Sequence, residues 1–98
     1  MYKPLPSCVT IKNSKIHGLG LFAASFIKEN TNLGLTHIYN EKFENNYIRT
    51  PLGGFFNHNS ENPNCKILKI DECLFLVTIK EVHPGEELTA KYTLYDPE

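Results

Sequence analysis

The chain has 98 residues, is 41% hydrophobic, and carries 10 basic and 11 acidic side chains for a net charge of −1. This size predicts a single domain with a small core. The sequence contains no basic stripe, membrane-length apolar run or apolar signal-peptide segment, so we expect a soluble, intracellular protein that contacts neither nucleic acid nor membranes directly.

The first half of the chain predicts short strands and one helix. Residues 9–12 alternate apolar and polar side chains, as in a half-buried strand, and residues 18–24 resume as a strand after two glycines. A turn is expected at residues 27–30 and a third strand at 33–39. We expect the one helix at residues 40–48, because Asn40 can cap it and Phe43 and Tyr47 lie one turn apart.

The second half predicts a hairpin followed by a turn and a last strand. Residues 65–70 and 73–80 read as strands on either side of Asp71-Glu72, and the second is apolar on both faces, which predicts burial on both sides. His83-Pro84-Gly85 is typical of a turn, and residues 87–92 form the last strand. Many short strands with frequent turns predict a compact, mostly β domain.

The cysteines Cys8, Cys65 and Cys73 are odd in number and widely spaced. This pattern fits neither a disulfide framework nor a zinc knuckle, and no metal site is predicted. We expect the three cysteines to be small, buried hydrophobic residues.

The segment at residues 54–65 carries the strongest functional signal. Its polar pair Asn57-His58 follows the aromatic pair Phe55-Phe56 and precedes a Pro63-Asn64 turn. Polar atoms beside an apolar flank need hydrogen-bond partners, which a bound ligand or the backbone at a chain crossing can provide.

Two further segments occur in a recognisable order with this one. The chain resembles a SET domain because Gly18-Leu19-Gly20 with Phe22, Asn57-His58 with Pro63-Asn64, and Gly85-Glu86-Glu87-Leu88-Thr89 with Tyr92 are similar to that family's three motifs. The resemblance covers about residues 9–95. It implies a compact SET-type (β-clip) fold of short strands in small sheets, with a pseudoknot-like C-terminal crossing. We expect one SET-like domain at residues 1–98 without pre-SET or cysteine-rich post-SET segments, similar to small stand-alone viral and bacterial members.

The resemblance implies a protein lysine N-methyltransferase that transfers a methyl group from S-adenosyl-L-methionine to a lysine of a protein, such as a histone, and releases S-adenosyl-L-homocysteine. Tyr92 is the implied catalytic residue. The implied cofactor-binding residues are Gly18, Leu19, Gly20, Phe56, Asn57, His58, Tyr92 and Tyr95. Tyr39, Tyr47 and Tyr95 are the candidates for lining a lysine channel.

Simple chemistry supports these roles. Lysine has a pKa of about 10.4 and must lose a proton before it attacks a methyl carbon, which an aromatic and poorly hydrated channel favours. Glycines at 18 and 20 allow close approach of the backbone to a ligand. A phenol with a pKa of about 10 is a poor general base, so Tyr92 would orient the amine.

Each site residue also has a structural interpretation. Asn57 and His58 can fix a crossing of the chain, while Phe55 and Phe56 suit the core. We expect Pro63-Asn64 to form a turn rather than a contact. Glu86 and Glu87 are expected to support the fold.

Departures from the family pattern favour a second hypothesis. Gly54 stands where an Arg is usual, Asn59 stands where a Ser is usual, and residues 33–39 supply Tyr39 and His37 but no Tyr-x-Gly. The alternative is therefore a catalytically weak or inactive SET-like binding module. A third is a structural domain whose motifs only hold the crossing together. Because the sequence stops soon after Tyr92, we expect a homodimer or the substrate to close the lysine channel.

Overall fold

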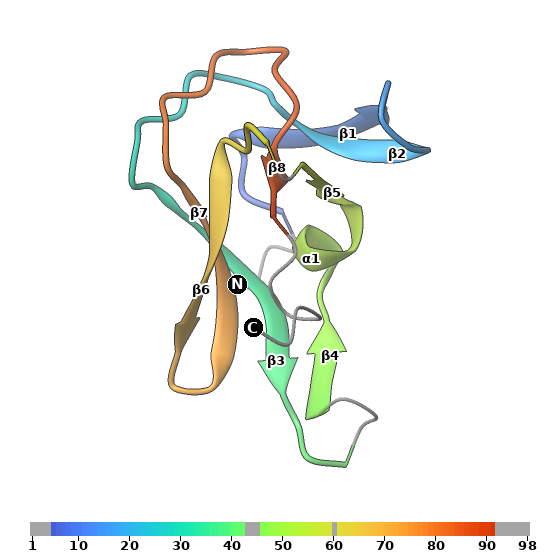
Figure 1. Ribbon diagram of the computed structural model, residues 1–98, viewed down its shortest axis with the longest axis vertical. Helices are drawn as coiled ribbons and strands as arrows, with labels where there is room; N and C mark the ends of the chain where they lie inside the picture. The colour runs from blue at the N-terminus through green and yellow to red at the C-terminus, as the bar shows by residue number, and fades with distance from the viewer. Residues whose placement is uncertain (1–4, 43–45, 60, 92–98) are drawn as a thin grey trace.

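The computed structural model describes residues 5–42, 46–59 and 61–91 and shows a mostly β fold (Figure 1). Its one regular α-helix in this part of the chain is short, and no described helix is long and apolar enough to cross a membrane. The elements in order are β1 (Val9–Asn13), β2 (Leu19–Ala23), β3 (Asn32–Tyr39), β4 (Tyr47–Arg49), α1 (Pro51–Phe55), β5 (Asn57–His58), β6 (Cys65–Ile70), β7 (Cys73–Thr78) and β8 (Thr89–Ala90).

The described strands form two sheets. β1 and β2 pair as an antiparallel hairpin, and the remaining strands form a curled six-stranded sheet in the order β4-β3-β7-β6-β8-β5 (Figure 1). The predicted β6–β7 hairpin is confirmed. Its turn residues Asp71 and Glu72 both have positive φ, 49° and 69°, as a two-residue type I′ hairpin turn requires.

The predicted helix at residues 40–48 is wrong. Tyr47 and Ile48 belong to β4, which pairs antiparallel with β3 so that Tyr47 faces Tyr39. The Asn40 side chain accepts a hydrogen bond from Lys42 N in a turn instead of capping a helix. Residues 43–45 lie outside the described residues. Cross-strand pairing of β-prone side chains therefore prevails over the helical spacing of the aromatic residues.

The helix that does form, α1, contains Gly53 and Gly54 and was not expected. Its N-cap is Thr50, whose Oγ1 accepts a hydrogen bond from Gly53 N at 3.2 Å, and Pro51 supplies a fixed φ in the first turn. Gly53 lies against β3, where a Cβ would stand 2.1 Å from the carbonyl oxygen of Thr36. Close packing on the sheet explains why glycine, a poor helix former, stands at this position of the helix.

Burial of β7 is complete on one face only. Leu74 and Leu76 are buried, as predicted, but Phe75 on the opposite face is only half-buried. The expectation of burial on both sides is therefore wrong for the end of the strand next to the hairpin turn. Nothing in the described residues covers that face fully.

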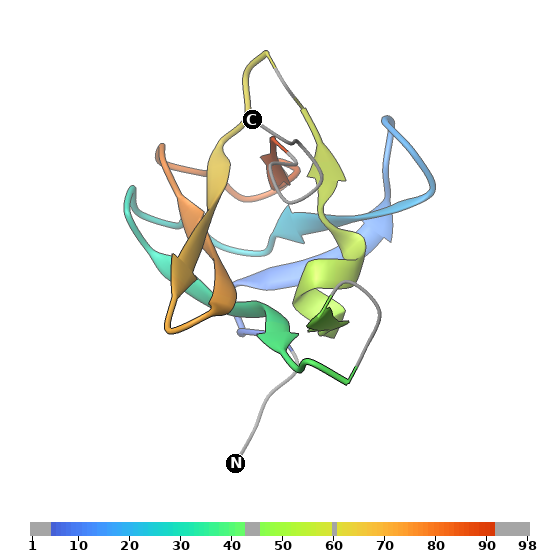
Figure 2. The same ribbon diagram turned by 60° about the horizontal axis from the view of Figure 1, so that its bottom comes forward.

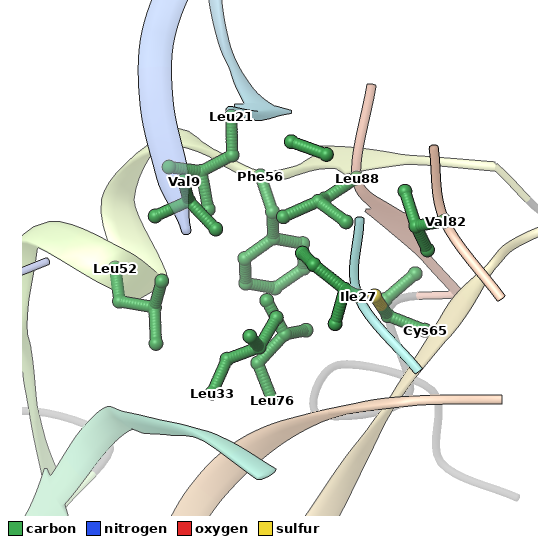
Figure 3. Packing of buried hydrophobic residues seen from close by; sticks show 12 residues of the cluster. Val9, Leu21, Ile27, Leu33, Leu52, Phe56, Cys65, Leu76, Val82 and Leu88 are labelled. Carbon is green, nitrogen blue, oxygen red and sulfur yellow. The ribbon is translucent and has the colours of Figure 1, made fainter. Parts of the chain in front are cut away.

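The core lies between the β1–β2 hairpin and the six-stranded sheet. Figure 3 shows the Phe56 ring at the centre of this cluster, with Leu21 on one side and Leu76 on the other. Leu88, from the C-terminal segment, is 0% exposed in the same cluster. Of the three free cysteines Cys65 is buried, and burial raises the pKa of its thiol to about 12. Cys8 and Cys73 are only half-buried, so the expectation of buried hydrophobes holds fully for one of the three.

The C-terminal segment passes between β5 and β6. β8 pairs in parallel with β5 on one side and with Cys65 of β6 on the other (Figure 2). This is the pseudoknot-like crossing that the sequence predicts.

The two glycines of α1 give a matched test of this packing. We expect Gly53→Ala to destabilise the protein by several kcal/mol, because its methyl group would overlap the Thr36 carbonyl. Gly54→Ala has only an ordinary contact, 3.7 Å to Arg49 Cδ, and should stabilise by up to about 1 kcal/mol through helix propensity. Urea unfolding of both variants measures the difference, and equal stabilities would contradict the packing.

Candidate active site

The crossing brings the Asn57-His58 pair beside the C-terminal motif. Asn57 pairs with Thr89 and His58 with Ala90, and Asn59 N donates to Ala90 O at 3.1 Å. Two motifs that are far apart in the sequence therefore form one continuous piece of sheet. This confirms that the two motifs meet.

Asn64 locks the crossing from the other side of the loop. Its Nδ2 donates to Glu87 O at 2.8 Å, and its Oδ1 accepts from Thr89 N at 2.9 Å. The Asn64 side chain thus gives the C-terminal segment the backbone hydrogen bonds that a neighbouring strand would otherwise provide. That Pro63-Asn64 does not contact a ligand stays a prediction, but Asn64 has a structural role that was not expected, because its amide side chain satisfies two backbone groups of a distant segment.

A polar cluster forms where Asn57 meets the end of the β1 strand. Asn57 Nδ2 lies 2.7 Å from Glu87 Oε2, 3.1 Å from Ser14 Oγ and 3.3 Å from the carbonyl oxygen of His17. The Ser14 hydroxyl lies 2.9 Å and 2.8 Å from the two oxygens of Glu87. Two distant segments, at residues 14–17 and at Asn57, therefore converge on the half-buried carboxylate of Glu87.

Gly20 has a protein-based reason to lack a Cβ. A Cβ at this position would lie 2.3 Å from Glu87 Oε2 and 3.1 Å from Asn57 Nδ2. The space that sequence analysis assigned to a ligand is thus occupied by the Glu87 carboxylate. Gly18 differs, because it has a left-handed φ of 49° and no atom of the described residues lies within 4 Å of its missing Cβ; Leu19, between the two glycines, is 49% exposed.

Glu87 is the site residue that sequence reasoning missed. Glu86 is the local support of the fold, since its side chain accepts a hydrogen bond from His83 N at 2.7 Å. Glu87 points into the cluster, and its side-chain partners among the described residues are the neutral groups of Ser14 and Asn57. A half-buried carboxylate with neutral partners attracts a cation. In the sequence, the one signal that sets Glu87 apart from Glu86 is its position as the second of the two adjacent glutamates in the motif.

The other predicted site residues are distributed around this cluster. His58 is exposed on β5, whereas the Phe56 side chain is 5% exposed and belongs to the core. Contact of Phe56 or His58 with a cofactor stays a prediction. Tyr92 and Tyr95 lie outside the described residues.

The two described channel candidates lie together on β3 and β4. The rings of Tyr39 and Tyr47 make an edge contact at 6.0 Å, and Tyr47 makes a second at 5.9 Å with His37. His37 is 6% exposed, and burial, with a smaller contribution from the charge of Arg49, lowers its pKa. The structure thus adds a buried histidine to this aromatic cluster.

Comparison with known proteins decides the family. A family model described as SET domain matches residues 36–93, more than half of the chain. The chain belongs to the SET domain family. The matched range of this SET domain begins in β3 and includes both β5 and β8, the strands that meet at the crossing.

Solved structures share the fold of this SET domain. A histone methyltransferase candidate from Plasmodium falciparum matches with a TM-score of 0.66 and 23% identity over 89% of this chain and 94% of that one. The methyltransferase domain of human PR domain-containing protein 2 matches with a TM-score of 0.72 and 21% identity over 96% and 82%. The SET domain of the RIZ1 tumor suppressor matches with a TM-score of 0.68 and 20% identity over 96% of this chain and 74% of that one. A search of curated proteins found no match.

Asn64 provides a test of the crossing. We expect Asn64→Ala to lower the free energy of unfolding by about 1–3 kcal/mol, because Glu87 O and Thr89 N lose their partner. Asn62→Ala is the matched control, since Asn62 is exposed, and should change it by no more than about 0.5 kcal/mol. Denaturant unfolding measures both, and an Asn64→Ala variant as stable as the control would show that the side chain does not hold the crossing.

Proposed function

We propose that this SET domain is a protein lysine N-methyltransferase that uses S-adenosyl-L-methionine. The observation that carries the proposal is the Glu87 carboxylate, held by Ser14 and Asn57 at the crossing and packed against Gly20. Family membership supports the reaction class, because SET-domain methyltransferases generally use this cofactor.

The chemistry of the cluster fits the cofactor. The Glu87 carboxylate and the His17 carbonyl are acceptors that can receive hydrogen bonds from an ammonium group. S-adenosyl-L-methionine carries an ammonium, a carboxylate and a sulfonium, and its ammonium matches a Glu87 carboxylate whose described partners are neutral. We infer that Asn57 and Glu87 hold the amino-acid end and that the open backbone at Gly18 and Leu19 lies along it.

The reaction needs an oriented, neutral amine. When bound, S-adenosyl-L-methionine supplies a methyl carbon on sulfonium sulfur, from which the lysine nitrogen lone pair displaces the thioether. The described residues would contribute orientation and exclusion of water. Tyr39 and Tyr47 would flank the lysine stem, and Tyr92 would orient the amine with its hydroxyl.

A protein substrate follows from the same proposal. The Plasmodium falciparum neighbour is described as a candidate histone methyltransferase, which makes core histones the first acceptors to test. A homodimer that closes the lysine channel stays a prediction.

One observation bears on the alternative, an inactive SET-like binding module. Gly54 replaces the Arg that is usual in the family, but the stem of Arg49 lies against it, 3.7 Å from where its Cβ would be. Arg49 therefore brings a cationic side chain to this neighbourhood from β4.

Glu87 and Glu86 give a matched test of cofactor binding. We expect Glu87→Gln to weaken binding of S-adenosyl-L-methionine by about tenfold or more, because the variant loses the charge that pairs with the ammonium. Glu86→Gln should bind like wild type, since Glu86 only caps its own turn. Isothermal titration calorimetry measures both. Wild-type protein that binds no cofactor at millimolar concentration would overturn the proposal.

Tyr92 separates enzyme from binding module. We expect Tyr92→Phe to bind the cofactor normally but to lose most methyl transfer, because the amine loses the hydroxyl that orients it. Transfer of tritiated methyl groups to core histones and lysate proteins is the measurement. Equal activity of variant and wild type would refute this role, and wild type that binds cofactor without transfer would favour the binding module.

A further inference from the structure

His37 has one ring nitrogen with a partner and one without. Its Nδ1 lies 3.0 Å from Thr36 Oγ1, and that hydroxyl donates its only hydrogen to Leu74 O at 3.1 Å. With that hydrogen directed at Leu74 O, Thr36 Oγ1 is the acceptor for an Nδ1 proton, and we assign to His37 the neutral tautomer with a lone pair on Nε2. Nε2 is buried and has no hydrogen-bond partner in the described part of the chain.

A buried acceptor without a donor costs free energy, and such groups often mark a functional position. Burial and the charge of Arg49 lower the pKa of His37, so that the imidazole is neutral and stays an acceptor at neutral pH. The site therefore calls for a group with an N–H or O–H donor.

A row of rings leads from the surface to this acceptor. Tyr39 is 37% exposed, Tyr47 is half-buried and His37 is 6% exposed, and each ring contacts the next by its edge. An unbranched aliphatic stem with a nitrogen donor at its end matches this order of apolar ring surfaces and terminal acceptor. A lysine side chain has this chemistry.

The fold ties this acceptor to the polar cluster at the crossing. Thr36 O, next to His37, accepts a hydrogen bond from Thr50 N at 2.9 Å and packs against Gly53 of α1. α1 ends at Phe55, and Asn57 follows two residues later. α1 thus packs against the residue next to the histidine and leads along the chain to the proposed cofactor-binding asparagine.

We propose that His37 is a substrate-binding residue whose Nε2 accepts a hydrogen bond from the ε-amine of the lysine to be methylated. The inference rests on the proposed methyl transfer and adds a named acceptor to it. With one N–H directed at His37, the amine lone pair is held in a fixed direction for attack. The positive charge of Arg49, which disfavours the imidazolium, also disfavours the ammonium form of a lysine bound beside it.

Three substitutions test the acceptor. His37→Phe keeps a ring beside Tyr47 but removes the acceptor, and we expect kcat/KM for methyl transfer to histones to fall about tenfold or more. His37→Gln retains an acceptor near the same position and should stay within about threefold of wild type. His83→Phe, at an exposed histidine outside this cluster, is the matched control.

Stability distinguishes this role from a structural one. His37→Phe should raise the midpoint of thermal unfolding while lowering activity, because it removes an unpaired buried polar atom. If this variant does not fold, Thr36→Val serves instead, since it leaves His37 in place but removes the acceptor that holds its proton on Nδ1. We expect that variant to lose transfer as well.

A spectroscopic measurement does not depend on turnover. In protein labelled with nitrogen-15 in histidine, n-butylamine, as a probe of the lysine side chain, should shift the Nε2 resonance of His37. Tetramethylammonium, which is a cation without N–H, should leave it unchanged. A resonance indifferent to both, with His37→Phe as active as wild type, would overturn the role of His37 while leaving the methyltransferase proposal intact. Wild type that neither binds cofactor nor transfers methyl groups would overturn both.

Discussion

The passage of the C-terminal segment between β5 and β6 is the constraint on which the rest of this SET domain depends. Parallel pairing on both sides holds β8, and the Asn64 side chain fixes the two backbone groups that enter it. The same passage seats Leu88 in the core and directs Glu87 to Ser14 and Asn57. Core, crossing and polar cluster are therefore one cooperative unit.

Two groups in this small protein are kept in states that folding alone would not favour. Glu87 is a half-buried carboxylate with neutral described partners, and His37 is a buried imidazole with one nitrogen that has no hydrogen-bond partner among the described residues. Each lacks the kind of partner that a methyl donor or a lysine would supply. Local conflicts of this kind are expected where a sequence is constrained by binding as well as by folding.

Strands and motif contacts could be predicted because their signals are local or belong to the family. Alternation placed β1, and the hairpin around Asp71-Glu72 placed β6, close to their observed bounds. The resemblance to the family predicted that Asn57 would meet the C-terminal segment. The failures are tertiary. Tyr47 joins a strand because β3 is its neighbour, and Gly53 tolerates a helix because a carbonyl lies against it.

The site residues that were missed have the same origin. Asn64 and Glu87 gain their roles from contacts with segments that are distant in the sequence. The Thr36 hydroxyl beside His37 is likewise held by a distant residue, because it donates to Leu74 O. Side-chain type alone does not show which nitrogen of a histidine lacks a partner. That becomes visible only once Leu74 is placed opposite it on β7.

The threaded topology also sets an order for biosynthesis. Asn57 pairs with Thr89, which is distant in the sequence. Closing this long stretch of chain costs conformational entropy before the pairing of β8 contributes any stability. A nascent chain released from the ribosome only as far as β7 has its hairpins but lacks Glu87 and Leu88. The crossing and its polar cluster therefore form last, because both need residues 87–90, and shorter translation products lack them.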